Sequence, residues 1–109
     1  MGPAAMIRAV ASLAFAIIHA GPASAQFYSG NKLHELCQAK DRIALGYAVA
    51  VTDWVMTEMR EQACIPSTVT TGQMHDIICG YVTQHPEQRH YNAHFLGAQS
   101  LIEAFPCNK

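Results

Sequence analysis

Residues 64–73, CIPSTVTTGQ, interrupt a chain that is otherwise patterned for helices. Pro66 cannot continue a preceding helix, because it lacks a backbone N–H and its ring clashes with the previous turn. Thr70 and Gln73 have the spacing of a capping box, in which each side chain binds a free backbone N–H at the start of a helix. The stretch is therefore predicted to be the joint between two helices.

Patterns typical of helices lie on both sides of this joint. Before it, a short helix is expected at residues 31–38, with Asn31 as its N-cap, followed by a long amphipathic helix at 41–62. The apolar residues of the long helix recur at every fourth position: Ile43, Tyr47, Val51, Val55 and Met59. After the joint, the apolar face of a third helix is formed by Met74, Ile77, Ile78, Tyr81 and Val82.

His85 and Pro86 are expected to end the third helix. Pro86 can also begin the last helix, because proline is favoured at the first helical position. The face expected to be buried in this last helix consists of Tyr91, Phe95, Ala98, Ile102 and Phe105. The sequence thus predicts an all-α fold, a small bundle of about four helices.

Residues 1–25 have the pattern of a cleaved signal peptide. Arg8 precedes an uncharged apolar run at 9–18 that is too short to span a bilayer, and small residues at 23–25 suit signal peptidase. A buried N-terminal helix is the alternative interpretation. We expect cleavage before Gln26, export to the periplasm or outside the cell, and a single all-helical domain at 26–109.

The charge of the chain argues against nucleic acid as a partner. Removing residues 1–25 removes one basic residue, Arg8, and takes the formal net charge from −1 to −2. A weakly acidic chain without a basic cluster has no electrostatic footprint for nucleic acid or for an anionic membrane surface. No later segment is apolar for long enough to span a membrane. Neither partner is expected for the cleaved chain.

All four cysteines lie after the predicted cleavage point, and an exported chain meets an oxidising environment that favours disulfides. Short connections make consecutive helices antiparallel, which places Cys64 close to Cys107. That bond would close a loop of about 43 residues and stabilise the fold by about 4 kcal/mol. Cys37 and Cys79 would then pair by elimination, although other connectivities and a buried free thiol at Cys79 stay open.

The histidines raise the question of a metal site. His90 and His94 have a spacing that lets two imidazoles on one helix face bind the same zinc or copper ion, and His85 is nearby. No HExxH or CxxC motif accompanies them, so an exposed helix flank is the favoured interpretation. We predict no metal and no other cofactor.

Catalysis by a cysteine and a histidine is also considered. One of the cysteines could act with His75 or His94, yet exported cysteines with available partners tend to be oxidised. The chain has no glycine-rich oxyanion loop and no paired carboxylates. It is therefore predicted not to be an enzyme.

Large apolar residues on the long helix allow two interpretations. Trp54, Met56 and Met59 can belong to the core or to an exposed recognition stripe for a partner. A small domain must bury its largest side chains, so the core is favoured.

Five short motifs, in order, give the chain a resemblance to a known family: FYSGNKLHELC at 27–37, GYAVAVTD at 46–53, CIPSTVTTGQ at 64–73, YVTQHPEQRH at 81–90 and LIEAFPC at 101–107. Together with the signal peptide, they resemble the Rap/Tai family of periplasmic immunity proteins, which protect bacteria from type VI secretion amidase toxins. The resemblance covers nearly all of residues 26–109.

This resemblance implies a non-catalytic, disulfide-linked helical protein, often a homodimer, that binds a peptidoglycan amidase and occludes its active-site cleft. Many members carry a cysteine just before the GY motif, where this chain has Ala44 and Leu45. Our hypothesis is that Cys79 replaces that cysteine as the partner of Cys37.

Two other functions are weighed against the amidase immunity protein. One is a small periplasmic acid-stress chaperone, which would expose apolar surface at low pH, and the other is a metal-binding protein. For the immunity protein, the loop at 64–70 is a candidate contact with the toxin, through Ser67 and Thr68.

Overall fold

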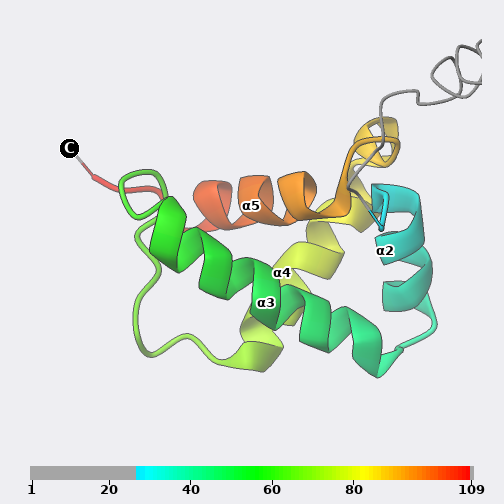
Figure 1. Cartoon of the computed structure of the whole chain (residues 1–109), viewed down its shortest axis with the longest axis horizontal. Helices are drawn as coiled ribbons and strands as arrows, with labels where there is room; N and C mark the ends of the chain where they lie inside the picture. The colour runs from blue at the N-terminus through cyan, green and yellow to red at the C-terminus, as the bar shows by residue number, and fades with distance from the viewer. Residues whose placement is uncertain (1–26, 109) are drawn as a thin grey trace, which may run out of the picture.

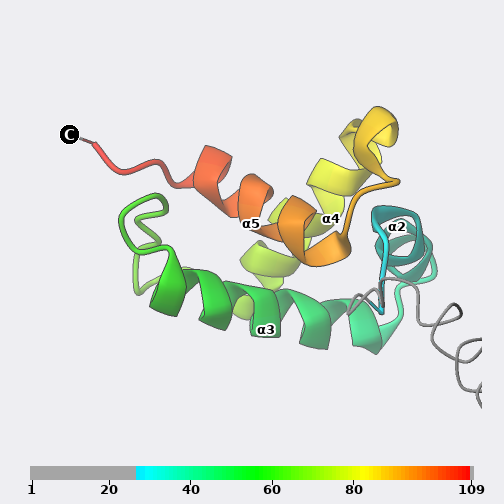
Figure 2. The ribbon, with the colours of Figure 1, turned by 45° about the horizontal axis from the view of Figure 1, so that its top comes forward.

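The computed structural model describes residues 27–108 and confirms the predicted all-α fold. The predicted signal peptide at 1–25 lies outside the described residues. Within them, the elements in chain order are α2 (Gly30–Gln38), α3 (Arg42–Glu58), α4 (Thr71–Gln84), the 3-10 helix η1 (Pro86–Gln88) and α5 (Ala93–Ala104). In Figures 1 and 2, α4 crosses behind α3 and α5, and α2 closes one end of the bundle. None of these helices is long and apolar enough to cross a membrane.

The helix after the joint at 64–73, α4, begins with the predicted capping box. Thr70 Oγ1 accepts from the Gln73 N–H at 3.1 Å, and Gln73 Oε1 accepts from the Thr70 N–H at 2.8 Å, which completes the capping box of α4. The N-cap of α2 is Ser29 and not Asn31. The next two N–H groups of α2 donate to carbonyls of distant residues, Gly30 to Tyr91 and Asn31 to Arg89, each at 2.8 Å.

The faces that the long helix and the last helix bury differ from those predicted. α3 buries Ala44, Ala48, Val51, Thr52 and Val55. α5 starts seven residues later than Pro86 and buries Ala93, Leu96, Gly97, Ala98, Ser100 and Leu101. Both sets follow the 3.6-residue period of an α-helix, whereas residues spaced by four drift about 40° per step around the axis. The third helix buries Ile78, Tyr81 and Val82, as predicted.

Gly97 sets the distance between α3 and α5. A Cβ atom at this position would lie 2.9 Å from Val51 Cγ1, closer than carbon atoms pack. We expect Gly97→Ala to lower the free energy of unfolding by about 1–3 kcal/mol, because overpacking outweighs the better helix propensity of alanine. Urea unfolding followed by circular dichroism measures the change.

Gly80, in the middle of α4, provides the matched control. A Cβ atom there meets nothing within 4 Å. Gly80→Ala should therefore stabilise the protein, by up to about 1 kcal/mol, through helix propensity alone. Equal effects of the two substitutions would contradict close packing at Gly97.

The structure contains the two cysteine pairs expected from the sequence. Cys37 in α2 is bonded to Cys79 in α4, with 5.7 Å between their Cα atoms. Cys64 is bonded to Cys107 near the end of the chain, with 5.0 Å between their Cα atoms. Beside this second bond, the Cys64 N–H donates to the Phe105 carbonyl at 2.8 Å, and Ala63 pairs with Pro106. Figures 1 and 2 show the loop after α3 next to the C-terminal segment, as these contacts require.

Candidate protein-binding surface

Four aromatic side chains from α3, α5 and the turn before α5 gather at the surface. Trp54 on α3 is 41% exposed, Phe95 on α5 is 50% exposed and Tyr91 is 47% exposed. His94 is also exposed and packs edge-on against Trp54, with 5.7 Å between the ring centres. Tyr91 packs edge-on against Phe95 at 6.0 Å. We call these four residues the aromatic surface.

Backbone hydrogen bonds fix the position of the aromatic surface. The Tyr91 carbonyl accepts from the Gly30 N–H, and the Ala93 N–H donates to the Tyr28 carbonyl at 3.0 Å. These bonds join the start of α5 to the start of α2. Phe95 points outward because its neighbours Leu96 and Ala93 occupy the buried face of the same helix turn. The aromatic rings thus stand on a rigid support, which lowers the entropy lost on binding.

Three adjoining hollows meet at Phe95. The first is formed by Tyr91, Asn92, His94 and Phe95. The second, of about 200 Å³, lies between α3 and α5, and its lining is mostly apolar: Trp54, Met59, Gln62, His94, Phe95, Ala98, Gln99 and Ile102. The third, of about 390 Å³, is polar: Tyr81, Glu87, Gln88, Tyr91, Phe95, Gln99 and Glu103. A protruding ring with hollows around it matches the shape of an interface centre, where aromatic anchors and pockets interlock.

The polar hollow gives the aromatic surface a negative edge. Glu87 and Glu103 line it, and neither belongs to an ion pair among the residues that the structure describes. Burial, followed by the Glu103 carboxylate, raises the pKa of the Tyr81 phenol. The Tyr81 hydroxyl donates to Gln88 Oε1 at 3.0 Å. A basic side chain of a partner would complement this edge.

The histidines considered for a metal site are kept apart by separate contacts. His85 stacks on Tyr81 at 4.0 Å, and its Nδ1 lies 2.9 Å from the Tyr81 carbonyl oxygen. His90 packs on Tyr91 in the turn before α5, so His90 and His94 do not share a helix face. Between residues 27 and 108, no three potential ligands among His, Cys, Asp and Glu lie close enough to hold a metal ion.

The cysteines considered for catalysis are all oxidised, so no described residue supplies a free thiol. His75 does lie beside a cysteine, since its Nε2 is 3.5 Å from Cys79 Sγ. That sulfur is bonded to Cys37 and is no nucleophile in this state. His94 contacts Trp54 instead.

The aromatic surface was missed from the sequence because Trp54, Tyr91 and Phe95 were expected in the core. The core was the favoured interpretation for Trp54, Met56 and Met59. Met59 is partly buried against the core, whereas Trp54 is 41% and Met56 40% exposed. The signal that would have found them is the run of small residues in the last helix, Ala93, Gly97 and Ser100, which allow close helix packing and mark the buried face. Ser67 and Thr68, the predicted contact residues, lie exposed in the turn of the joint and do not belong to the aromatic surface.

These features define a class of protein: a small, disulfide-linked helical bundle with a rigid aromatic surface. The family model of the Rap1a immunity proteins matches residues 29–107. The chain belongs to this family, which confirms the resemblance found in the sequence, and it is an immunity protein. Such proteins act by binding a toxin partner. Searches of curated proteins and of solved structures returned no match.

Proposed function

We propose that the chain protects the periplasm by binding a type VI secretion toxin, a peptidoglycan amidase, and occluding its active-site cleft. Membership of the Rap1a immunity protein family is the observation that carries this proposal. The amidase and the periplasm come from the resemblance and from the predicted signal peptide at 1–25. The protein catalyses nothing in this role, and its contribution is a surface that excludes substrate.

We further propose that the aromatic surface is the part of the chain that contacts the amidase. Large aromatic residues are the commonest energetic centres of protein interfaces, because they bury much area with few rotatable bonds. Trp54 and Phe95 expose two-fifths to half of their surface, while the helices that carry them are fixed in the core. Glu87 and Glu103 would pair with basic residues of the amidase at the edge of the contact.

A co-expression experiment tests the proposal. A peptidoglycan amidase is directed to the periplasm of a bacterium together with the full chain, and lysis is scored. We expect the full chain to prevent lysis and a chain lacking residues 1–25 to fail, because it stays in the cytoplasm. Lysis despite stable full-length protein, for every amidase of a type VI panel, would overturn the amidase as partner.

The same material shows whether the chain self-associates. The resemblance implies a protein that is often a homodimer, and light scattering of the purified protein detects that state. Measuring the mass with and without the amidase separates self-association from toxin binding. A mass of one chain without the amidase, and of one chain plus one amidase with it, would reject the homodimer and leave the proposed inhibition intact.

A further inference from the structure

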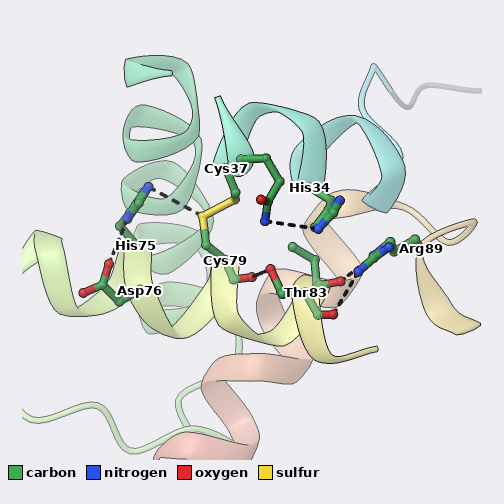
Figure 3. Close-up of a disulfide and its surroundings, with 9 residues drawn as sticks. His34, Cys37, His75, Asp76, Cys79, Thr83 and Arg89 are labelled. Atoms are coloured by element: carbon green, nitrogen blue, oxygen red, sulfur yellow. Dashed lines mark hydrogen bonds and ion pairs between the residues drawn. A yellow bond between two sulfur atoms is a disulfide. The ribbon is translucent and has the colours of Figure 1, made fainter. Parts of the chain in front are cut away.

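The disulfide between α2 and α4 lies beside a histidine and an aspartate. His75 Nε2 is 3.5 Å from Cys79 Sγ, and His75 Nδ1 is 3.1 Å from Asp76 Oδ1 (Figure 3). An ionised carboxylate only accepts hydrogen bonds, so Nδ1 carries the proton of the neutral ring. The lone pair of Nε2 therefore faces the sulfur, and it can take up a proton there.

Two other titratable groups near this bond, His34 and Arg89, are engaged elsewhere. On α2, His34 is hydrogen-bonded to Gln38 at 3.3 Å, and burial, followed by the charge of Arg89, lowers the pKa of His34. Arg89 donates to the carbonyls of Val82 and Thr83, at the end of α4. Among the described residues, His75 is the one imidazole within hydrogen-bond distance of a disulfide sulfur.

The second disulfide has no such neighbour in the described part of the chain. The sulfur atoms of Cys64 and Cys107 lie 3.9 and 3.6 Å from the Arg60 carbonyl oxygen. A carbonyl oxygen cannot supply a proton to a departing thiolate. The two bonds close loops of almost the same length, 42 and 43 residues, so their surroundings are what distinguish them.

We propose that the Cys37–Cys79 disulfide is a thiol-exchange site, which accepts a small thiol such as glutathione on Cys37. The thiolate of the small thiol attacks Cys37 Sγ, a new sulfur–sulfur bond forms there, and the electron pair of the old bond leaves with Cys79. The proton that the small thiol gave up is taken by His75 Nε2, which donates it in a hydrogen bond to the Cys79 thiolate. Asp76 stabilises the resulting imidazolium at Nδ1.

The direction of attack follows from the leaving group. In thiol–disulfide exchange the sulfur that forms the more stable thiolate leaves faster, and the other sulfur is attacked. A neighbouring imidazolium stabilises a thiolate strongly. Cys79 is the only one of the four cysteines with this neighbour among the described residues, so Cys37 receives the incoming sulfur. A second thiol molecule would attack the mixed disulfide and release Cys37 as a free thiol.

Limited reaction with glutathione tests the proposal on the oxidised, folded chain. The protein is exposed briefly to reduced glutathione, quenched with N-ethylmaleimide and digested, and the modified cysteines are identified by mass spectrometry. We expect the first product to carry glutathione on Cys37 and N-ethylmaleimide on Cys79. His75→Gln should form this product about ten-fold more slowly, because the thiolate loses its proton donor.

His34→Gln is the matched control, since it removes an imidazole one turn from Cys37 on α2. It should react within about two-fold of the original rate, because His34 is bonded to Gln38 and is not within hydrogen-bond distance of either sulfur. If His75→Gln merely loosened the helix, the bond would become more exposed and the rate would rise, so the direction of change separates the two explanations. The proposal is overturned by a first adduct on Cys79, Cys64 or Cys107, by His75→Gln reacting at the original rate, or by equal slowing in His34→Gln.

Discussion

Replacing Trp54 and Phe95 together with alanine is expected to weaken amidase binding by about one hundred-fold or more, since truncating a central aromatic residue commonly costs about 2–4 kcal/mol. Both side chains border the same hollow between α3 and α5, so the double substitution removes one continuous contact area. The protein should also lose some stability, because Trp54 is only 41% and Phe95 only 50% exposed and the rest of each ring is buried in the fold. Isothermal titration with the amidase and thermal melting measure the two quantities.

Met56→Ala is the control for this experiment. Met56 lies on the same helix as Trp54 and has the same exposure, 40% against 41%. Two residues along a helix rotate the side chain by about 200°, so Met56 faces the opposite flank of α3. Replacing Met56 should leave the affinity for the amidase within about three-fold of that of the unchanged chain, as expected for a residue outside the contact. Equal losses from both variants would show that the aromatic surface is not the contact.

A third variant decides between this surface and the joint of the two helices. Ser67→Ala with Thr68→Ala removes the hydroxyl groups that the sequence indicated as a protruding contact. If the amidase instead binds this loop, the loop variant would lose affinity and the aromatic variant would keep it. Light scattering gives the mass of all three variants and identifies a further outcome, in which the aromatic surface is the contact between two copies of the chain and does not bind the toxin.

The sequence was sufficient for the parts of the fold that depend on local chemistry. Pro66, Thr70 and Gln73 determine where one helix stops and the next begins, because ring geometry and capping act within a few residues. The pairing of Cys64 with Cys107 followed from helix order and short connections. The prediction of Asn31 as the N-cap of α2 was wrong. The helix begins after Ser29, and the N–H groups of Gly30 and Asn31 donate to the carbonyls of Tyr91 and Arg89, far along the chain.

The exposed faces were harder to predict, and with them the candidate site. Tyr91 and Phe95 were placed in the core because large apolar residues usually lie there. Burial in α5 is decided instead by which face lets the helices approach closely, and Gly97 against Val51 provides that face. Large side chains on the remaining flank are left at the surface. Small residues at helical spacing can therefore indicate the buried face of a helix, even where a stripe of aromatic residues suggests another face.

Removing the bond between Cys64 and Cys107, with alanine at both positions, is expected to lower the free energy of unfolding by about 2–4 kcal/mol. The bond restricts the unfolded chain by closing a loop of 43 residues. The slope of the denaturation curve against urea should rise, because the unfolded chain without the bond exposes more surface. Urea denaturation under oxidising conditions gives both values.

The corresponding variant of Cys37 and Cys79 tests the reason for this loss. The Cys37–Cys79 bond closes a loop of 42 residues, almost as long as that of the Cys64–Cys107 bond. If the effect is purely entropic, both variants should lose the same free energy of unfolding. Only the variant at positions 64 and 107 should also speed exchange of the backbone amide hydrogen at position 64, which donates to the Phe105 carbonyl beside that disulfide. The same end of the bundle carries Met59 and Gln62, which line the hollow next to Trp54. A loss below about 0.5 kcal/mol would mean that the helices hold this end without the bond, and that the disulfide serves the shape of the binding surface more than the stability of the fold.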